Sequence, residues 1–136
     1  GWYEWKQVER ADPATGEIKL VKQPHFFHLP DDRLFAFAGV MAMWKPANEE
    51  TWQASCAFLT RDALGAAAGI HERMPVVLSK DSESAWLDPK ITDAGQAMAI
   101  ASEHGVTQFV HHAVGGRVNV ARNDDESLIQ AVNRAS

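Results

Sequence analysis

Residues 34–44 read LFAFAGVMAMW, and together with a second apolar stretch at 52–60, WQASCAFLT, they decide the fold. Neither stretch contains a charged residue. Continuous apolar runs of this kind are typical of strands covered on both faces, so we expect a buried strand at 34–44 and a central strand at 52–60. Gly39, inside the first run, indicates a bulge or the close approach of another backbone segment.

The residues before these stretches predict a strand-rich N-terminal segment. Residues 2–6 place large rings around Glu4 and Lys6, an alternation that favours a strand. Residues 11–17, ADPATGE, contain the proline, aspartate and glycine of a turn. Short strands are expected on the far side of this turn, at 18–21 and 24–29.

The residues after the apolar stretches mix helical and strand signals. Helical segments are expected at 62–68, 82–87, 92–104 and 127–132, and strands at 76–78, 108–114 and 117–120. The segment 92–104 carries the clearest helix signal, because Thr92 suits the N-cap and Gly105 suits the position after the last turn. This order of elements predicts a mixed α+β domain, with strands too irregularly spaced for a doubly wound sheet.

Length, charge and cysteine content restrict the class of protein. The chain has 136 residues, the size of one domain, and a net charge of −5, which argues against broad binding to duplex DNA. No apolar run approaches the roughly 20 residues of a membrane span. The single cysteine, Cys56, excludes an internal disulfide framework and favours a reducing, cytoplasmic compartment. Because the chain opens without methionine inside a strand-like run, we interpret it as a fragment or a processed chain.

Glu4 is the carboxylate with the most unusual surroundings, since it lies between Tyr3 and Trp5. Aromatic neighbours desolvate a carboxylate and raise its pKa toward the range of a general base. The alternative is a solvated glutamate on the exposed face of a strand. Trp5 offers a ring on which a DNA base can stack, although a lone tryptophan is more often part of a core.

Histidines and the cysteine supply the remaining reactive groups. Residues 71–75, HERMP, lack the second histidine of a zinc-protease motif, and the histidine pairs at 25/28 and 111/112 point to opposite faces of strands, so we expect no metal site. Cys56 with His71 as its base would make a cysteine peptidase, but its apolar strand predicts a buried, inert thiol. Arg73 suits either a phosphate or a surface salt bridge.

Six segments, taken in order, resemble the SOS response-associated peptidase (SRAP) family. The strongest are residues 1–6 (GWYEWK), 22–27 (KQPHFF), 35–40 (FAFAGV) and 70–78 (IHERMPVVL), followed by weaker matches at 85–87 (AWL) and 114–119 (VGGRVN). The resemblance covers the C-terminal part of the family's domain. It implies one SRAP-like domain over residues 1–136 that lacks its N-terminal segment. The implied fold is α+β, with a mixed, largely antiparallel, barrel-like sheet and a few short flanking helices.

The resemblance also implies a chemistry. Members of this family sense abasic sites in single-stranded DNA and form a covalent crosslink, because an N-terminal cysteine condenses with the sugar aldehyde to a thiazolidine. Glu4 would orient or deprotonate the amine, and His71 would assist opening of the sugar ring. Trp5 would stack beside the lesion, Arg73 would hold a phosphate, and Thr60 would line the pocket. No metal or other cofactor is implied.

Three departures from the family's pattern keep other functions open. The N-terminal cysteine and an early DNA-binding segment are absent, and Gly115-Gly116 replaces a more polar pair. A self-processing cysteine peptidase and a non-enzymatic DNA-binding remnant therefore remain alternatives, and whether this chain is itself an enzyme stays open. The expected partners are single-stranded DNA with abasic sites and the missing N-terminal segment, in the cytoplasm or, when DNA is bound, at the bacterial nucleoid.

Overall fold

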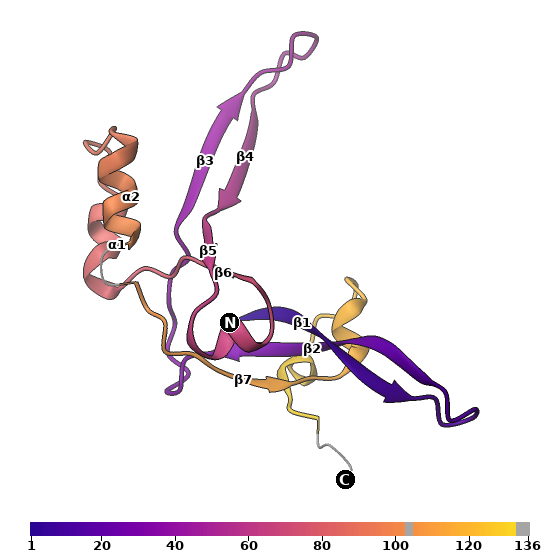
Figure 1. The fold of residues 1–136 in the computed structure, drawn as a ribbon. Helices are drawn as coiled ribbons and strands as arrows, with labels where there is room; N and C mark the ends of the chain where they lie inside the picture. The colour runs from indigo at the N-terminus through magenta and orange to yellow at the C-terminus, as the bar shows by residue number, and fades with distance from the viewer. Residues whose placement is uncertain (103–104, 133–136) are drawn as a thin grey trace. The chain divides into compact units, whose positions relative to one another are not determined.

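The computed structural model describes residues 1–102 and 105–132, which divide into two compact units. The first unit comprises residues 1–33 and 65–72 together with the described residues from 108 onward. The second comprises residues 34–64 and the described residues of 73–107. Figure 1 shows the elements of both units as ribbons.

The first unit is built on a three-stranded antiparallel sheet. Strands β1 (Trp2–Ala11) and β2 (Ile18–His28) form a long hairpin, and β7 (Val110–Ala113) pairs with the other edge of β2 (Figure 1). The predicted strand at 2–6 and the turn at 11–17 are confirmed, while the strands predicted at 18–21 and 24–29 are one continuous strand. Gly16 adopts a φ of +72° in the turn, a conformation that glycine reaches without steric cost.

Three short 3-10 helices complete this unit. They are η1 (Gly65–Gly69), η2 (Gly116–Asn119) and η3 (Glu126–Ile129). The strand predicted at 117–120 is therefore wrong. Arg117, the basic residue of η2, pairs with Asp125 at 2.8 Å and donates to Ser127, so local side-chain contacts hold this segment in a compact turn rather than in a ladder.

The core of the first unit lies on one face of its sheet, around Phe27. The Phe27 side chain is fully buried, its ring stacks on Trp2 at a centroid distance of 4.8 Å, and His111 lies 4.8 Å away. Phe109 meets the edge of Trp2 at 4.9 Å. Because Trp2 and Glu4 are two residues apart in β1, this packing places both side chains on the same face of the strand.

The second unit contains two two-stranded sheets and two helices. Strand β3 (Gly39–Trp44) pairs with β4 (Gln53–Phe58), and β5 (Thr60–Asp62) pairs with β6 (Arg73–Pro75), both antiparallel. The helices are α1 (Lys80–Trp86) and α2 (Ala94–Ser102). The small core of this unit comprises Ala38, Val76, Leu78 and Ala101.

The expectation of buried strands at 34–44 and 52–60 is wrong. Regular strand begins only at Gly39, and every residue of β4 is exposed, as is all of β3 except Gly39. Met41 is 71% exposed and Phe58 63% exposed. The physical reason is that, among the described residues, β3 and β4 form a two-stranded sheet of their own, and two strands alone cannot cover the faces from which their side chains project. An apolar run shows that a strand can be buried, but a covering layer decides whether it is.

The helices differ from expectation at their boundaries. The helix predicted at 62–68 is replaced by the end of β5 and by η1. The helix predicted at 92–104 is present as α2, although Asp93 rather than Thr92 accepts the capping hydrogen bond, from the Gln96 amide at 2.8 Å. Its predicted last residues, Glu103 and His104, lie outside the described residues.

The α+β class and the antiparallel character of the sheets are confirmed. Within residues 1–102 and 105–132 the strands form three separate sheets and no closed barrel. Among these residues no helix is long and apolar enough to cross a membrane.

Candidate functional site

Glu4 and His71 lie beside each other in the first unit. Glu4 lies on strand β1, opposite His25 of β2. His71 lies in the loop that follows η1, and its backbone amide donates to the Ala67 carbonyl at 3.0 Å. The Nδ1 atom of His71 is 3.9 Å from Oε2 of Glu4. Their side chains are 48% and 20% exposed, respectively, so the carboxylate is the more buried partner and the imidazole faces solvent.

The surroundings of Glu4 favour its protonated form. Burial raises the pKa of this carboxyl above its ordinary value of 4.5, because a charge is poorly solvated there. The nearby His71 and hydrogen bonding from the Trp2 side chain act in the opposite direction and lower the pKa. The net direction is upward, and the side chain is only 20% exposed, so the alternative of a solvated glutamate on the exposed face of a strand is wrong.

A pocket of about 410 Å³ contains this pair. It is lined by Glu4, Trp5, Lys22, His71 and Asn119, all from the first unit. The half-buried Trp5 donates from its indole Nε1 to Oδ1 of Asn119 at 2.8 Å, which holds the ring in one orientation. The pocket therefore combines a carboxylate, an imidazole, an aromatic face, an amide and a lysine ammonium group.

Asn119 and Lys22 are members of the pocket that the sequence alone did not indicate. Asn119 is 114 residues from Trp5 along the chain, and only the folding of η2 against the hairpin brings the two together. The weak family match at 114–119 was the available signal for Asn119. For Lys22 the available signal was the family match at 22–27, of which it is the first residue.

Arg73 and Thr60 contact each other within the second unit. The Arg73 guanidinium donates to the Thr60 carbonyl at 2.7 Å and to its hydroxyl at 3.1 Å. It also pairs with Asp62 at 2.6 Å. Arg73 thus forms the surface salt bridge that was the alternative to phosphate binding, and Asp62 is a competitor for any phosphate that approaches it.

Cys56 is exposed, so the expectation of a buried thiol is wrong. It lies on β4 of the second unit, where it pairs with Met41 of β3. The reason is the one that exposes the whole ribbon, namely that two strands alone cannot cover their own faces. Within the described residues the Cys56 side chain has no hydrogen-bond or ion-pair partner.

Four other histidines within residues 1–102 and 105–132 line the two faces of the three-stranded sheet. His25 and His111 approach with their Nδ1 atoms 3.1 Å apart on the face of Phe27, while His28 and His112 pack around Phe26 on the other. This arrangement confirms that each histidine pair diverges. The described residues contain no group of three or more side chains able to hold a metal ion.

The pocket around Glu4 and His71 is suited to acid–base chemistry on a small polar group. A carboxylate with a raised pKa accepts a proton more readily near neutrality, and a solvent-facing imidazole can both donate and accept one. The ring of Trp5 offers a flat surface, and Lys22 supplies a positive charge. This combination fits a sugar or a nucleotide next to a phosphate.

Comparison with known proteins places the chain in a family. The family model for SOS response associated peptidase (SRAP) matches residues 1–121. Abasic site processing protein YoqW of Bacillus subtilis is 31% identical over 131 residues, covering 96% of this chain and 54% of the relative. Abasic site processing protein HMCES of Xenopus tropicalis is 29% identical over 140 residues, covering 97% of this chain and 41% of the relative.

A solved structure agrees with these matches at the level of the fold. The crystal structure of a protein from Bacteroides thetaiotaomicron superposes with a TM-score of 0.75 at 17% identity, covering 98% of this chain and 54% of the other. The chain spans about half the length of the curated relatives it matches. On the family match over most of its length, the chain belongs to the SOS response associated peptidase (SRAP) family.

Proposed function

We propose that this chain carries the acid–base part of a protein that recognises abasic sites in single-stranded DNA and captures them covalently. The observation that carries the proposal is the approach of Glu4 to His71 at 3.9 Å inside one pocket. The family membership and the relatives named for abasic site processing support the substrate. The protein would act in the cytoplasm, and at the nucleoid when DNA is bound.

The roles of the pair follow from the chemistry of an abasic sugar. The closed sugar must open to its aldehyde, and His71 assists by moving a proton between the ring oxygen and the hydroxyl. An amine then attacks the aldehyde carbon and water leaves, which gives an imine. Glu4 accepts the proton that the amine must lose before it attacks, a role suited to a carboxylate whose pKa is raised.

The nucleophile is an N-terminal cysteine that residues 1–136 do not supply. After its amine has formed the imine, its thiol adds to the imine carbon, and the sulfur proton passes to nitrogen. This closes a thiazolidine ring with no change of oxidation state. The segment bearing that cysteine would be the partner of this chain within the same protein.

Trp5, Arg73 and Thr60 would position the DNA. The Trp5 ring, held by Asn119, is available for stacking beside the lesion, where a missing base leaves room for an aromatic surface. Arg73 would hold a phosphate after exchanging its contact with Asp62, and Thr60 would line the same part of the second unit.

Intact mass measurement of the full gene product tests the proposal. We expect the protein to gain the mass of single-stranded DNA that contains one abasic site, less one water. DNA carrying a tetrahydrofuran analogue has no aldehyde, so it should bind without a covalent gain, and undamaged DNA should give none. Binding to the abasic strand with no covalent gain would favour the non-enzymatic DNA-binding alternative, and cleavage of added proteins would favour the peptidase.

Asp62→Asn should strengthen DNA binding. The change removes the carboxylate that pairs with Arg73 at 2.6 Å and that repels an approaching phosphate. Because the Asp62 side chain is 91% exposed, the pair itself is weak, and the dissociation constant for tetrahydrofuran-containing DNA should fall by a few-fold. Fluorescence anisotropy measures it, with Asp81→Asn as an exposed control in the same unit. Unchanged or weaker binding by Asp62→Asn alone would contradict the proposed role of Arg73.

A further inference from the structure

We propose that His25 is a positioning residue for Glu4, held in one protonation form by a proton that it shares with His111. Neither of these histidines takes part in the proton transfers proposed for Glu4 and His71. The effect on DNA capture rests on the proposed function, whereas the shared proton is a property of the folded chain alone.

His25 is the one buried polar side chain found within residues 1–102 and 105–132, with an exposed fraction of 7%. A buried imidazole must be hydrogen-bonded to offset its loss of water. His25 meets this requirement through His111, because the Nδ1 atoms of the two rings are 3.1 Å apart. The rings are nearly perpendicular, with centroids 5.0 Å apart. The fold therefore builds an imidazole pair into the interior of the first unit.

The pair lies on the face of the sheet that carries Glu4. In the strand register, Glu4 is directly opposite His25, and His111 is directly opposite Phe27. Directly opposite residues of antiparallel strands have Cβ atoms about 4.5–5.5 Å apart. Trp2 closes the other side, since its side chain hydrogen-bonds to Glu4 while its ring stacks on Phe27. The histidine pair is thus part of the wall against which Glu4 rests.

Two Nδ1 atoms at this distance hold one proton between them. A neutral imidazole carries its proton on one nitrogen, so one ring donates from Nδ1 while the other accepts there and keeps its own proton on Nε2. One added proton turns the donor ring into an imidazolium and leaves the hydrogen bond intact. A second would set two N–H groups against each other. The pair in this arrangement therefore carries at most one positive charge.

The charged groups around the pair decide which ring donates. Burial lowers the pKa of His111, and the charges of Lys6 on β1 and His112 on β7 lower it further. On the other ring, the Glu4 carboxyl lies opposite His25 and favours a positive charge there. A proton added to the pair therefore resides on His25, with His111 as the acceptor.

This arrangement keeps Glu4 able to act as a base. Burial raises the pKa of Glu4 and so favours the protonated carboxyl, which cannot accept a proton. An imidazolium at His25 opposes this effect, as His71 does from 3.9 Å away on the solvent side. The two histidines thus support the carboxylate from two directions, one buried and one exposed.

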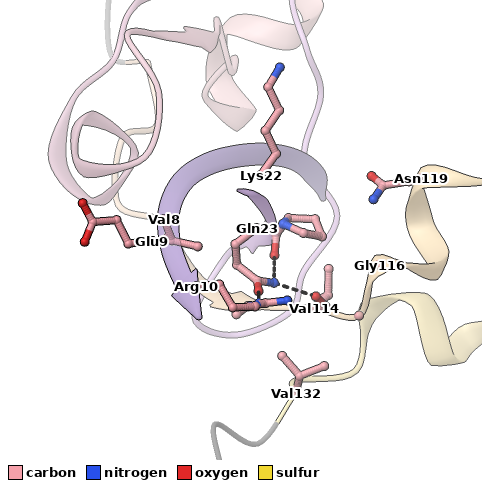
Figure 2. A pocket seen from close by; sticks show the side chains of 12 residues that line it. Val8, Glu9, Arg10, Lys22, Gln23, Val114, Gly116, Asn119 and Val132 are labelled. Atoms are coloured by element: carbon pink, nitrogen blue, oxygen red, sulfur yellow. Dashed lines mark hydrogen bonds between the residues drawn. The ribbon is translucent and has the colours of Figure 1, made fainter. Parts of the chain in front are cut away.

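Other contacts hold β7 to β2 beside the pair, so the histidines can be replaced without detaching the strand. Figure 2 shows the Gln23 side chain, which donates to the carbonyl of Val114 at 2.8 Å, just beyond the end of β7. The Val114 amide donates in turn to the Pro24 carbonyl at 3.0 Å. His25→Phe or His111→Phe would keep a ring in the face of the sheet and remove the shared proton.

NMR titration of the full gene product without DNA tests the inference. Imidazole nitrogen shifts report the tautomer of each ring, and the side-chain carboxyl carbon shift follows Glu4. We expect His111 to keep its proton on Nε2 as pH falls, while His25 takes up the charge. In His25→Phe and His111→Phe the midpoint of the Glu4 titration should move to higher pH, because the neighbouring charge or its acceptor is lost. His111→Asn should restore the wild-type midpoint, since its amide oxygen accepts a hydrogen bond near the position of Nδ1.

His28→Phe is the matched control, since it makes the same change on the same strand but on the opposite face, and it should leave the Glu4 titration unchanged. The inference is overturned if both phenylalanine variants at positions 25 and 111 keep the wild-type midpoint, or if His111 carries its proton on Nδ1. Covalent capture measured on the same preparations separates the two proposals. Capture with an unmoved Glu4 midpoint removes the inference alone, whereas a moved midpoint without capture supports the inference and removes the proposed function.

Discussion

Glu4→Gln should slow covalent capture of abasic DNA by a factor of about 10²–10⁴, the usual contribution of a general acid or base. The amide keeps the size of the side chain but cannot accept a proton from the attacking amine. The rate is measured by quenching the reaction at intervals and following the adduct by intact mass. Glu17→Gln makes the same chemical change in the exposed turn of the hairpin and should leave the rate unchanged.

The pH profile of the same variant gives a second, independent result. In the wild type the rate should fall as pH drops through the pKa of Glu4, which burial raises above 4.5, and this acidic limb should vanish in Glu4→Gln.

The raised pKa means that the folded protein binds this proton more tightly than the unfolded chain. The contribution of Glu4 to stability therefore decreases as pH rises from 4.5, the ordinary value, through the raised pKa of the folded state. Glu4→Gln removes the desolvated charge and should not lower the melting temperature at neutral pH. A variant that captures DNA at the wild-type rate, with the acidic limb intact, would exclude Glu4 as the base.

Phe27→Ala should destabilise the protein by about 3–5 kcal/mol, a large part of the roughly 5–15 kcal/mol that holds a domain folded. Phe27 is fully buried near the C-terminal end of β2, and its loss would leave a cavity between the rings of Trp2 and His111. Urea unfolding followed by tryptophan fluorescence measures the change, because Trp2 reports directly on this core.

Leu20→Ala is the control for this prediction. Leu20 lies on the same strand but is 69% exposed, so its truncation should change stability by no more than about 0.5 kcal/mol. If the two variants lose equal stability, the face of the sheet around Phe27 is not the core of the first unit. Because Glu4 lies on the same face of β1 as Trp2, Phe27→Ala should also slow covalent capture, whereas Leu20→Ala should not.

The short-range features of this protein follow from its sequence. The strand at 2–6 follows from alternating side chains, and the turn at 11–17 follows from residues that favour tight backbone geometry, including Gly16 at a φ of +72°. The strand character of 39–44 and 53–58 was also predicted. These features depend on neighbours a few residues apart, and such preferences are already present in the unfolded chain.

Burial and the composition of the site required the tertiary structure. Apolar residues at 34–44 and 52–60 predicted buried strands, but their exposure depends on which other elements pack there. Family resemblance indicated Glu4 and His71, while their separation of 3.9 Å and the desolvation of Glu4 come from the fold. Asn119 reaches Trp5 from 114 residues away. The sequence by itself determined the local elements and the reactive residue types, and only the tertiary structure decided which of them meet, because long-range contacts arise from packing rather than from neighbouring residues.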